Sequence, residues 1–284
     1  MNYRREIVQI IRSRLTSDGD GVKISRVAGF NQPNFSPFLM LDELKSDSRD
    51  DYIGGFPPHP HRGIETLTYM LKGHFQHKDH MGNIGELRSG GAQWMASGKG
   101  VIHSEMPIME DGDLHGFQIW INQPALDKVK PAQYRDFQSE TITEYTDSDL
   151  GLVRVLAGNM FIGEHVLSGP LNQTGVPLSV SVSDWQAEAK QSLKVTTTAT
   201  SNLILYVYKG QVDVHYQTLR QGELAVLSQG DYIEVTAQVV SGVMVLQGEP
   251  IDEPVVHHGP FVMNSMQEIE QAISDYNNGE FEKY

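Results

Sequence analysis

Two short segments of this chain carry residues that commonly bind metal ions, and each segment spaces them two positions apart. His59 and His61 form the first pair, and His103 and Glu105 form the second. In an extended strand, side chains at positions i and i+2 project from the same face. Two strands that meet across a barrel or sandwich would therefore bring these four donors to one point. Three imidazoles and one carboxylate suit a divalent transition metal such as iron, manganese, nickel or zinc.

The composition restricts what such a site can be and where the chain works. The 284 residues include no cysteine, so disulfides and thiolate ligands are excluded and any metal site must use histidine and carboxylate. The formal net charge of -14 makes direct contact with nucleic acid or an anionic membrane unfavourable. No apolar run is long enough to span a membrane, and no apolar core follows the basic N-terminal residues. We therefore expect a cytoplasmic protein without a signal peptide.

Around the candidate ligands, the pattern predicts short strands separated by glycine-rich turns. Candidate strands lie at residues 6–12, 22–27, 65–71 and 114–122. Leu67 and Tyr69 share the parity of His59 and His61, so a strand without a bulge would turn the ligands toward an apolar interior. Many short strands with closely spaced glycines predict an all-β barrel or sandwich.

The chain also repeats itself over the length of a domain. Residues 69–73 resemble residues 206–210 at an offset of 137, and residues 85–87 resemble residues 222–224. A repeat of this length indicates a duplicated fold. We divide the chain into a metal-binding domain at 1–131, a second domain at 132–250 and a C-terminal tail at 251–284. In the tail, Ser265 to Glu268 resembles a capping box and predicts a short helix that packs on the barrels.

The repeat predicts that only the first domain binds a metal. An offset of 137 carries His59 and His61 to Thr196 and Thr198, and an offset of 139 carries His103 and Glu105 to positions without a ligand. The positions reached by the second offset are Gly242 and Met244. The second domain is therefore expected to be a metal-free copy that contributes packing or pocket shape.

Other histidines and aromatic residues receive simpler interpretations. His74, His77 and His80 flank a predicted hairpin loop, and we expect them to be solvated. Trp94, Phe117 and Trp120 are expected in the core.

Several ordered segments resemble known families. His59 and His61, with Glu65 four positions later and Gly73 at the end of the strand, resemble the first cupin motif, and residues 98–103 resemble the second. More specifically, a series of segments resembles the pirin family. These segments are residues 37–43, 56–63, 81–83, 93–95, 100–105, 114–118 and 258–264.

The resemblance implies two tandem cupin β-barrel (jelly-roll) domains with one mononuclear metal, usually Fe(II), in the N-terminal barrel. Its ligands would fall on His59, His61, His103 and Glu105. Glu65 occupies the position of the carboxylate ligand in ordinary cupins. The parity of the strand favours Glu105 instead, which leaves Glu65 to pair with Arg62 or to support a ligand.

The resemblance also implies a function. Several pirin-like proteins are described as quercetin 2,3-dioxygenases, which open a flavonol ring with O2, and Glu105 could act there as ligand and as catalytic base. Animal pirins are instead associated with redox-sensitive regulation of transcription factors, which would require a protein partner. A cupin isomerase or sugar-binding module is a third alternative, although no anion-binding residues stand out.

Overall fold

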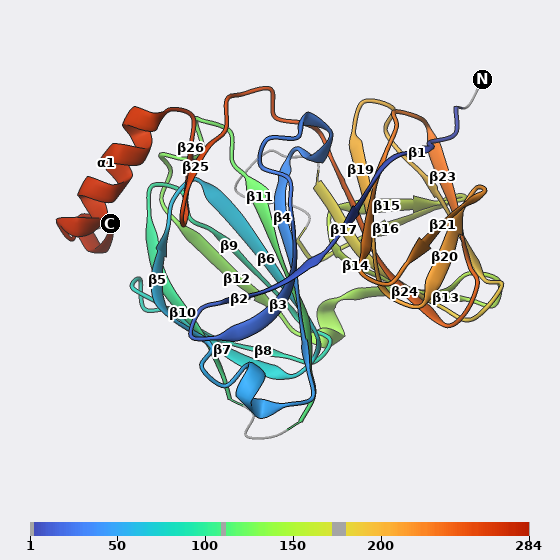
Figure 1. The fold of residues 1–284 in the computed structure, drawn as a ribbon, viewed down its shortest axis with the longest axis horizontal. Helices are drawn as coiled ribbons and strands as arrows, with labels where there is room; N and C mark the ends of the chain where they lie inside the picture. Colours follow the sequence, from blue (N-terminus) through green and yellow to red (C-terminus); the bar gives the residue numbers. More distant parts are fainter. Residues whose placement is uncertain (1–2, 109–111, 172–179, 284) are drawn as a thin grey trace. The chain divides into compact units, whose positions relative to one another are not determined.

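The computed structural model describes residues 3–108, 112–171 and 180–283, and it confirms the all-β prediction (Figure 1). The strands form two compact units, each built around two large sheets, and the N-terminal unit also contains a two-stranded sheet. We call them the N-terminal barrel (Leu15–Asn31, Phe38–Ser139, Ile251–Tyr284) and the C-terminal barrel (Met1–Arg14, Gln32–Pro37, Glu140–Pro250). No helix in the described part of the chain is both long and apolar enough to cross a membrane.

These units group the chain differently from the continuous division at 1–131, 132–250 and 251–284. The first residues of the chain lie with the C-terminal barrel because β1 (Ile7–Arg12) pairs antiparallel with β22 (Glu223–Leu227), more than 200 residues later in the sequence. Conversely, the tail lies with the N-terminal barrel. Local patterns do not specify pairings of such long range, and the division along the sequence therefore missed them.

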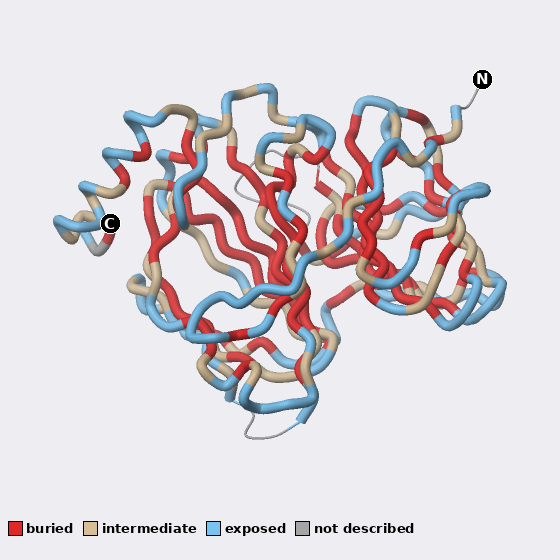
Figure 2. Tube along the Cα trace, viewed as in Figure 1, coloured by how far each residue is buried: buried red, intermediate tan, exposed pale blue. Residues whose placement is uncertain are grey.

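The larger sheet of the N-terminal barrel contains seven strands. These are β2 (Arg14–Asp18), β3 (Val22–Ala28), β4 (Phe38–Ser46), β6 (Ile64–Lys72), β9 (Ala92–Ala96), β11 (Leu114–Asn122) and β12 (Gln133–Phe137). They are ordered β12-β9-β6-β11-β4-β3-β2. The central strands β4, β6, β9 and β11 are buried along most of their length, as Figure 2 shows.

The smaller sheet carries the candidate ligands. It contains β5 (Phe56–His61), β7 (His74–Asp79), β8 (Ile84–Arg88) and β10 (Val101–Pro107), in the order β5-β10-β7-β8. Because β5 lies at the edge of this sheet, its three prolines leave few ladder hydrogen bonds unmade. The parity shared by His59 and Tyr69 required an unbroken strand between them, and this condition is not met, because β5 and β6 belong to different sheets.

The break between β5 and β6 lies at Arg62 and Gly63. Gly63 has φ +83°, and an added Cβ would lie 2.0 Å from the carbonyl oxygen of Val262. Only glycine accepts this backbone conformation at so close an approach. The chain therefore leaves one sheet and enters the other within two residues.

The C-terminal barrel repeats the arrangement. Its strands are β1, β13 (Thr143–Asp147), β14 (Gly151–Ala157), β15 (Asn159–Ile162), β16 (His165–Ser168), β17 (Val180–Ala187), β18 (Ser192–Thr196), β19 (Asn202–Lys209), β20 (Gln211–Val214), β21 (Gln217–Arg220), β22, β23 (Tyr232–Ala237) and β24 (Ser241–Gly248). They form sheets ordered β1-β22-β19-β24-β17-β14-β13 and β16-β15-β18-β23-β20-β21. Its interior is filled by aliphatic side chains around Trp185.

The sheet orders confirm part of the predicted repeat and correct the rest. β6 and β19 occupy equivalent places, as the match of residues 69–73 to 206–210 predicts. By the same order β10 corresponds to β23, so the projection of His103 onto Gly242 in β24 is wrong. The match of residues 85–87 to 222–224 is also wrong, because it joins β8 to the start of β22, the counterpart of β9. A loop-length difference between short strands is enough to shift such an alignment. β18 and β23 contain no histidine, and the metal-free second barrel stays a prediction.

The predicted C-terminal helix is confirmed as α1 (Met266–Asn277), which follows the hairpin of β25 (Val256–His258) and β26 (Phe261–Met263) (Figure 1). The Ser265 hydroxyl accepts from the backbone N–H of Glu268, and the Glu268 carboxylate accepts from the backbone N–H of Asn264. These bonds satisfy donors that the helix start would otherwise leave unpaired. The helix buries Ile269 and Ala272 in a small cluster of the N-terminal barrel that includes Phe261 and Phe281.

The core of the larger sheet also contains a buried acid. Glu65 on β6 is 1% exposed; its Oε2 accepts a 2.7 Å hydrogen bond from the indole of Trp94, and its Oε1 has no partner in the described part of the chain. Burial, together with Asp127, raises the pKa of Glu65 to about 8 although the Trp94 bond lowers it. The alternative pairing of Glu65 with Arg62 is wrong, because Arg62 binds Asp275 and the carbonyl of Lys99.

We predict that Glu65 makes the stability of the protein fall as pH rises. Its folded-state pKa exceeds the usual 4.5, so its stabilising contribution is fully present below pH 4.5 and is lost as pH rises through about 8. The Glu65→Gln variant should therefore gain stability relative to the parent between pH 5 and pH 8, by on the order of 1.4 kcal/mol for each pKa unit of the shift. Denaturant unfolding at both pH values, expressed as variant minus parent, measures it; a pH-independent difference would contradict it.

Candidate metal centre

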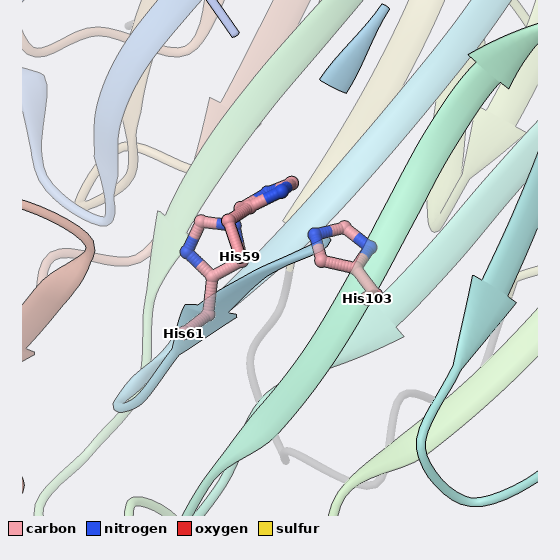
Figure 3. A group of neighbouring side chains, drawn as sticks. All are labelled: His59, His61 and His103. Carbon is pink, nitrogen blue, oxygen red and sulfur yellow. The ribbon is translucent and has the colours of Figure 1, made fainter. Parts of the chain in front are cut away.

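The described residues contain one group of three metal-binding side chains, and it consists of His59, His61 and His103 (Figure 3). Their candidate ligand atoms all lie within 4.8 Å of one another. The antiparallel pairing of β5 with β10 places His59 directly opposite His103, and His61 lies two residues along the same strand. The predicted convergence of these three residues is therefore present in the structure.

Hydrogen bonds on the outer side of each ring determine which nitrogen faces the centre. The Nδ1 of His59 lies 2.8 Å from the carbonyl oxygen of Pro57, and the Nδ1 of His61 lies 3.3 Å from that of Pro260. A carbonyl oxygen only accepts, so the Nδ1 of each ring carries a proton, and in the neutral form of the ring the lone pair lies on Nε2. His103 has the same arrangement, because its Nδ1 contacts His77 while its Nε2 is buried without a hydrogen-bond partner.

The electrostatics of the site favour neutral rings. Burial, and then the neighbouring His59, lowers the pKa of His61 to about 3, and the same causes lower the pKa of His103. Metal ions bind the neutral form of imidazole. Burial thus favours His61 and His103 as neutral nitrogen donors, and the Nε2 of His103 has no hydrogen-bond partner. The residues present fit a divalent transition metal.

Glu105 lies on β10, the strand that carries His103, but its side chain has a different environment. It is buried, and its carboxylate accepts from the side-chain amide of Gln118 at 3.1 Å and from the hydroxyl of Thr68 at 3.3 Å. The register shift in the pairing of β10 with β5 lies on β5, which uses three residues from Phe56 to His59 against two on β10. β10 pairs with β7 without interruption, so Glu105 keeps the parity of His103. Glu105 is not a member of the three-histidine group, and its role as ligand and catalytic residue stays a prediction.

A cavity of about 920 Å³ opens beside the histidines within the N-terminal barrel. His59 and His61 contribute to its wall, and so does Gln118, whose side of the strand could not be assigned from the sequence. The rest of the lining is mainly apolar and aromatic. It includes Ala28, Phe30, Met40, Phe56, Pro57, Trp120, His257 and Pro260.

One part of the cavity wall is charged. Arg26 donates two hydrogen bonds to the carboxylate of Asp42, at 2.8 and 2.7 Å, and a further one to Asp18. Burial raises the pKa of Asp42, and the bonds from Arg26 counteract this rise. With Asp20 also in the wall, carboxylates outnumber the guanidinium, so this part favours hydroxyl or amine donors over anions.

The expectations for the aromatic residues are confirmed in part. Trp94 and Phe117 are fully buried, as predicted for core residues. Trp120 instead lines the cavity and meets the ring of His61 edge-on at 5.1 Å. Alternation along a strand cannot distinguish a core position from a cavity wall, since both face the interior.

The expectation of solvated loop histidines is wrong for His77. His77 is 2% exposed, and it contacts His103 rather than solvent. The i, i+3 spacing of His74 and His77 does not bring these side chains together, because positions three apart lie on opposite faces of a strand. His77 and Asp79 share the same i, i+2 spacing that identified the ligands. His74 binds Glu86, and His80 accepts from the backbone N–H of Ile102.

Comparisons with known proteins agree with this architecture. Residues 21–121 match the family model described as Pirin, and residues 182–282 match the one described as Pirin C-terminal cupin domain. A protein of Vibrio cholerae named "Putative quercetin 2,3-dioxygenase" is 62% identical over 284 residues, covering 100% of both chains. Human pirin is 34% identical over 288 residues, covering 98% of this chain and 94% of its own.

Solved structures show the same relationship. The crystal structure of quercetin 2,3-dioxygenase from Acinetobacter baumannii matches with a TM-score of 0.89 and 29% identity, covering 98% of each chain. The family is shown by three observations together. The chain folds into two cupin barrels, the first barrel contains the three-histidine centre, and each barrel matches a pirin family model. The chain belongs to the pirin family.

Proposed function

We propose that this protein is a metal-dependent dioxygenase that cleaves a flavonol such as quercetin with O2. One observation carries the proposal: the ligand atoms of three imidazoles lie within 4.8 Å of one another, and two of these residues, His59 and His61, line a large cavity whose wall is mainly apolar. A flat polyphenol matches such a lining, because its rings can pack on Phe30 and Trp120 while its hydroxyls meet carboxylates. The names of the Vibrio and Acinetobacter relatives support the same substrate class.

The metal would be held by His59, His61 and His103, with Glu105 proposed as the fourth ligand. Fe(II) is the first choice, and Mn, Ni or Zn fit the same nitrogen donors. A bound divalent ion supplies Lewis acidity that polarises a coordinated hydroxyl group. The buried rings hold their lone pairs inward before any ion binds, so little reorganisation is needed.

The residues of the chain provide the remaining functions. Glu105 is proposed to take the proton of the flavonol hydroxyl, since its carboxylate is buried beside the cavity residue Gln118. Gln118 donates to both carboxylate oxygens and thereby fixes their direction. The apolar wall excludes water from the reacting ring.

The competing function is a metal-dependent, redox-sensing regulator that binds a protein partner, and the similarity to human pirin supports it. Both functions require the metal, so only turnover separates them. For either, the net charge of -14 argues against direct nucleic-acid contact, and the cytoplasm is the proposed location.

We predict that removal of one histidine of the centre abolishes tight metal binding. The His61→Ala variant should bind Zn(II) roughly 100-fold more weakly than the parent, because a tridentate nitrogen set becomes bidentate. Competition with a chelating dye measures this affinity. His74→Ala, which removes a histidine that binds Glu86 on the neighbouring hairpin, is the control and should bind as the parent does. Equal affinities for His61→Ala and the parent would exclude this centre.

We also predict that the iron-loaded protein turns over quercetin under air. Loss of flavonol absorbance and release of carbon monoxide measure this turnover. The Glu105→Gln variant should lower kcat by about 10²-fold or more, since an amide cannot accept the proton. His59→Ala should be inactive. An iron-loaded parent without turnover would refute the enzyme and favour the regulator. A Glu105→Gln variant as active as the parent would refute only the role of Glu105.

A further inference from the structure

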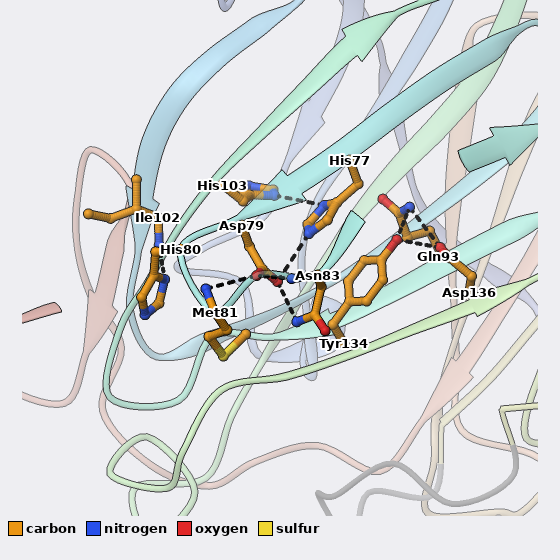
Figure 4. Close-up of polar contacts among 10 residues, drawn as sticks. All are labelled: His77, Asp79, His80, Met81, Asn83, Gln93, Ile102, His103, Tyr134 and Asp136. Atoms are coloured by element: carbon orange, nitrogen blue, oxygen red, sulfur yellow. Dashed lines mark hydrogen bonds and ion pairs between the residues drawn. The ribbon is translucent and has the colours of Figure 1, made fainter. Parts of the chain in front are cut away.

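A row of buried polar side chains continues outward from His103 (Figure 4). The Nδ1 of His103 lies 3.4 Å from the Nδ1 of His77, and the Nε2 of His77 lies 3.3 Å from the Oδ2 of Asp79. Both side chains of the outer pair are almost completely buried, with 1% and 0% exposure. The row therefore begins at a candidate ligand and ends at a carboxylate.

The chemistry of its last member gives this row a single direction. A carboxylate accepts hydrogen bonds, so the Nε2 of His77 donates to Asp79, and this is the proton-bearing nitrogen in the neutral form of the ring. The Nδ1 of His77 is then an acceptor, and it takes the hydrogen bond of the Nδ1–H of His103. This leaves the lone pair of His103 on Nε2, the buried atom that has no other partner.

Asp79 is fixed in position by the turn that follows it. Its Oδ1 accepts from the backbone N–H groups of Met81 and Asn83, both at 3.0 Å. Its Oδ2 accepts from the side-chain amide of Asn83 at 2.8 Å, as well as facing His77. The carboxylate can therefore neither rotate nor withdraw without breaking several hydrogen bonds.

The ring of His77 is also held from its flat side. Tyr134 on β12 stacks on it, with ring centroids 4.1 Å apart and an angle of 20° between the planes. The Tyr134 hydroxyl donates to Asp136 and accepts from Gln93. The ring of His77 on β7 is therefore held between Tyr134 on β12 and His103 on β10, and it contacts the three-histidine centre through His103.

We propose that His77 and Asp79 are positioning residues that fix the tautomer of His103 and thereby set the affinity of the three-histidine centre for a divalent metal. His59 and His61 obtain the same tautomer from backbone carbonyls, which cannot reverse their direction. His103 instead contacts His77, whose Nδ1 can either donate or accept a hydrogen bond. The bond of His77 to Asp79 makes this nitrogen the acceptor. This inference rests on the metal centre of the proposed function and not on its substrate.

The Asp79→Asn variant tests the proposal with almost no change in shape. Two backbone donors keep the amide oxygen at the Oδ1 position, so the NH2 group replaces Oδ2 and donates to His77. The side-chain amide of Asn83, which donates to Oδ2 in the parent, then rotates so that its oxygen accepts from this NH2 group. His77 must then carry its proton on Nδ1 and donate to His103. As a result, the proton of His103 moves to Nε2 and blocks the lone pair that binds the metal.

Two measurements follow. Long-range 1H–15N spectra of the metal-free, histidine-labelled protein report the tautomer, with His103 assigned from the spectrum of His103→Gln. We expect the Nδ1–H tautomer in the parent and the Nε2–H tautomer in Asp79→Asn. Zn(II) affinity, by dye competition, should fall about 10- to 100-fold. Glu86→Gln, which alters the His74–Glu86 pair on the same hairpin, is the matched control and should change neither readout.

Retention of the Nδ1–H tautomer in Asp79→Asn would overturn the proposal, and so would a changed tautomer with unchanged Zn(II) affinity. A second pair of variants covers a failure of Asp79→Asn to fold. His77→Gln offers an oxygen acceptor to His103 and should retain more Zn(II) affinity than His77→Phe, which keeps only the stacking on Tyr134. Equal affinities for the two would also overturn it. Failure of quercetin turnover in the parent would refute the proposed enzyme and leave these outcomes unchanged.

Discussion

The structure of the site depends on one antiparallel pairing, that of β5 with β10. It places His59 opposite His103, which are more than 40 residues apart in the sequence, and it brings His61 to the same side. Pairing registers in a sheet are specified in steps of one residue, and a slip of one would turn each ligand to the other face. The prolines of β5 and the Gly63 turn restrict the conformations that this edge strand can adopt, and so they support the register.

Burial gives this pairing its chemical value. The rings of His61 and His103 are removed from water, which keeps them neutral, and every outer nitrogen has a defined partner. The inner nitrogen of His103, its Nε2, is buried without a hydrogen-bond partner, and an unsatisfied buried polar atom costs free energy. A bound metal ion removes that cost, so the same features that destabilise the empty centre favour its occupation.

The cavity beside the metal centre provides space for a ligand. An aromatic wall beside the histidines provides area for a flat molecule, and the Asp18, Arg26 and Asp42 group provides direction. The residues that line the cavity come from early segments of the N-terminal barrel, such as Asp18 to Phe30, and also from the β25–β26 hairpin, which contributes His257. The tail therefore contributes to the site as well as to the core.

Local sequence patterns are enough to predict the all-β class, the short C-terminal helix and the three histidines of the centre. Period-two alternation, a capping box and the HxH spacing are local signals, and local geometry fixes their meaning. Local patterns do not specify the environment of Glu105, the burial of His77, the position of Trp120 in the cavity wall or the pairing of β1 with β22. Each of these depends on which strands become neighbours, and such long-range pairings leave no periodic trace in the chain.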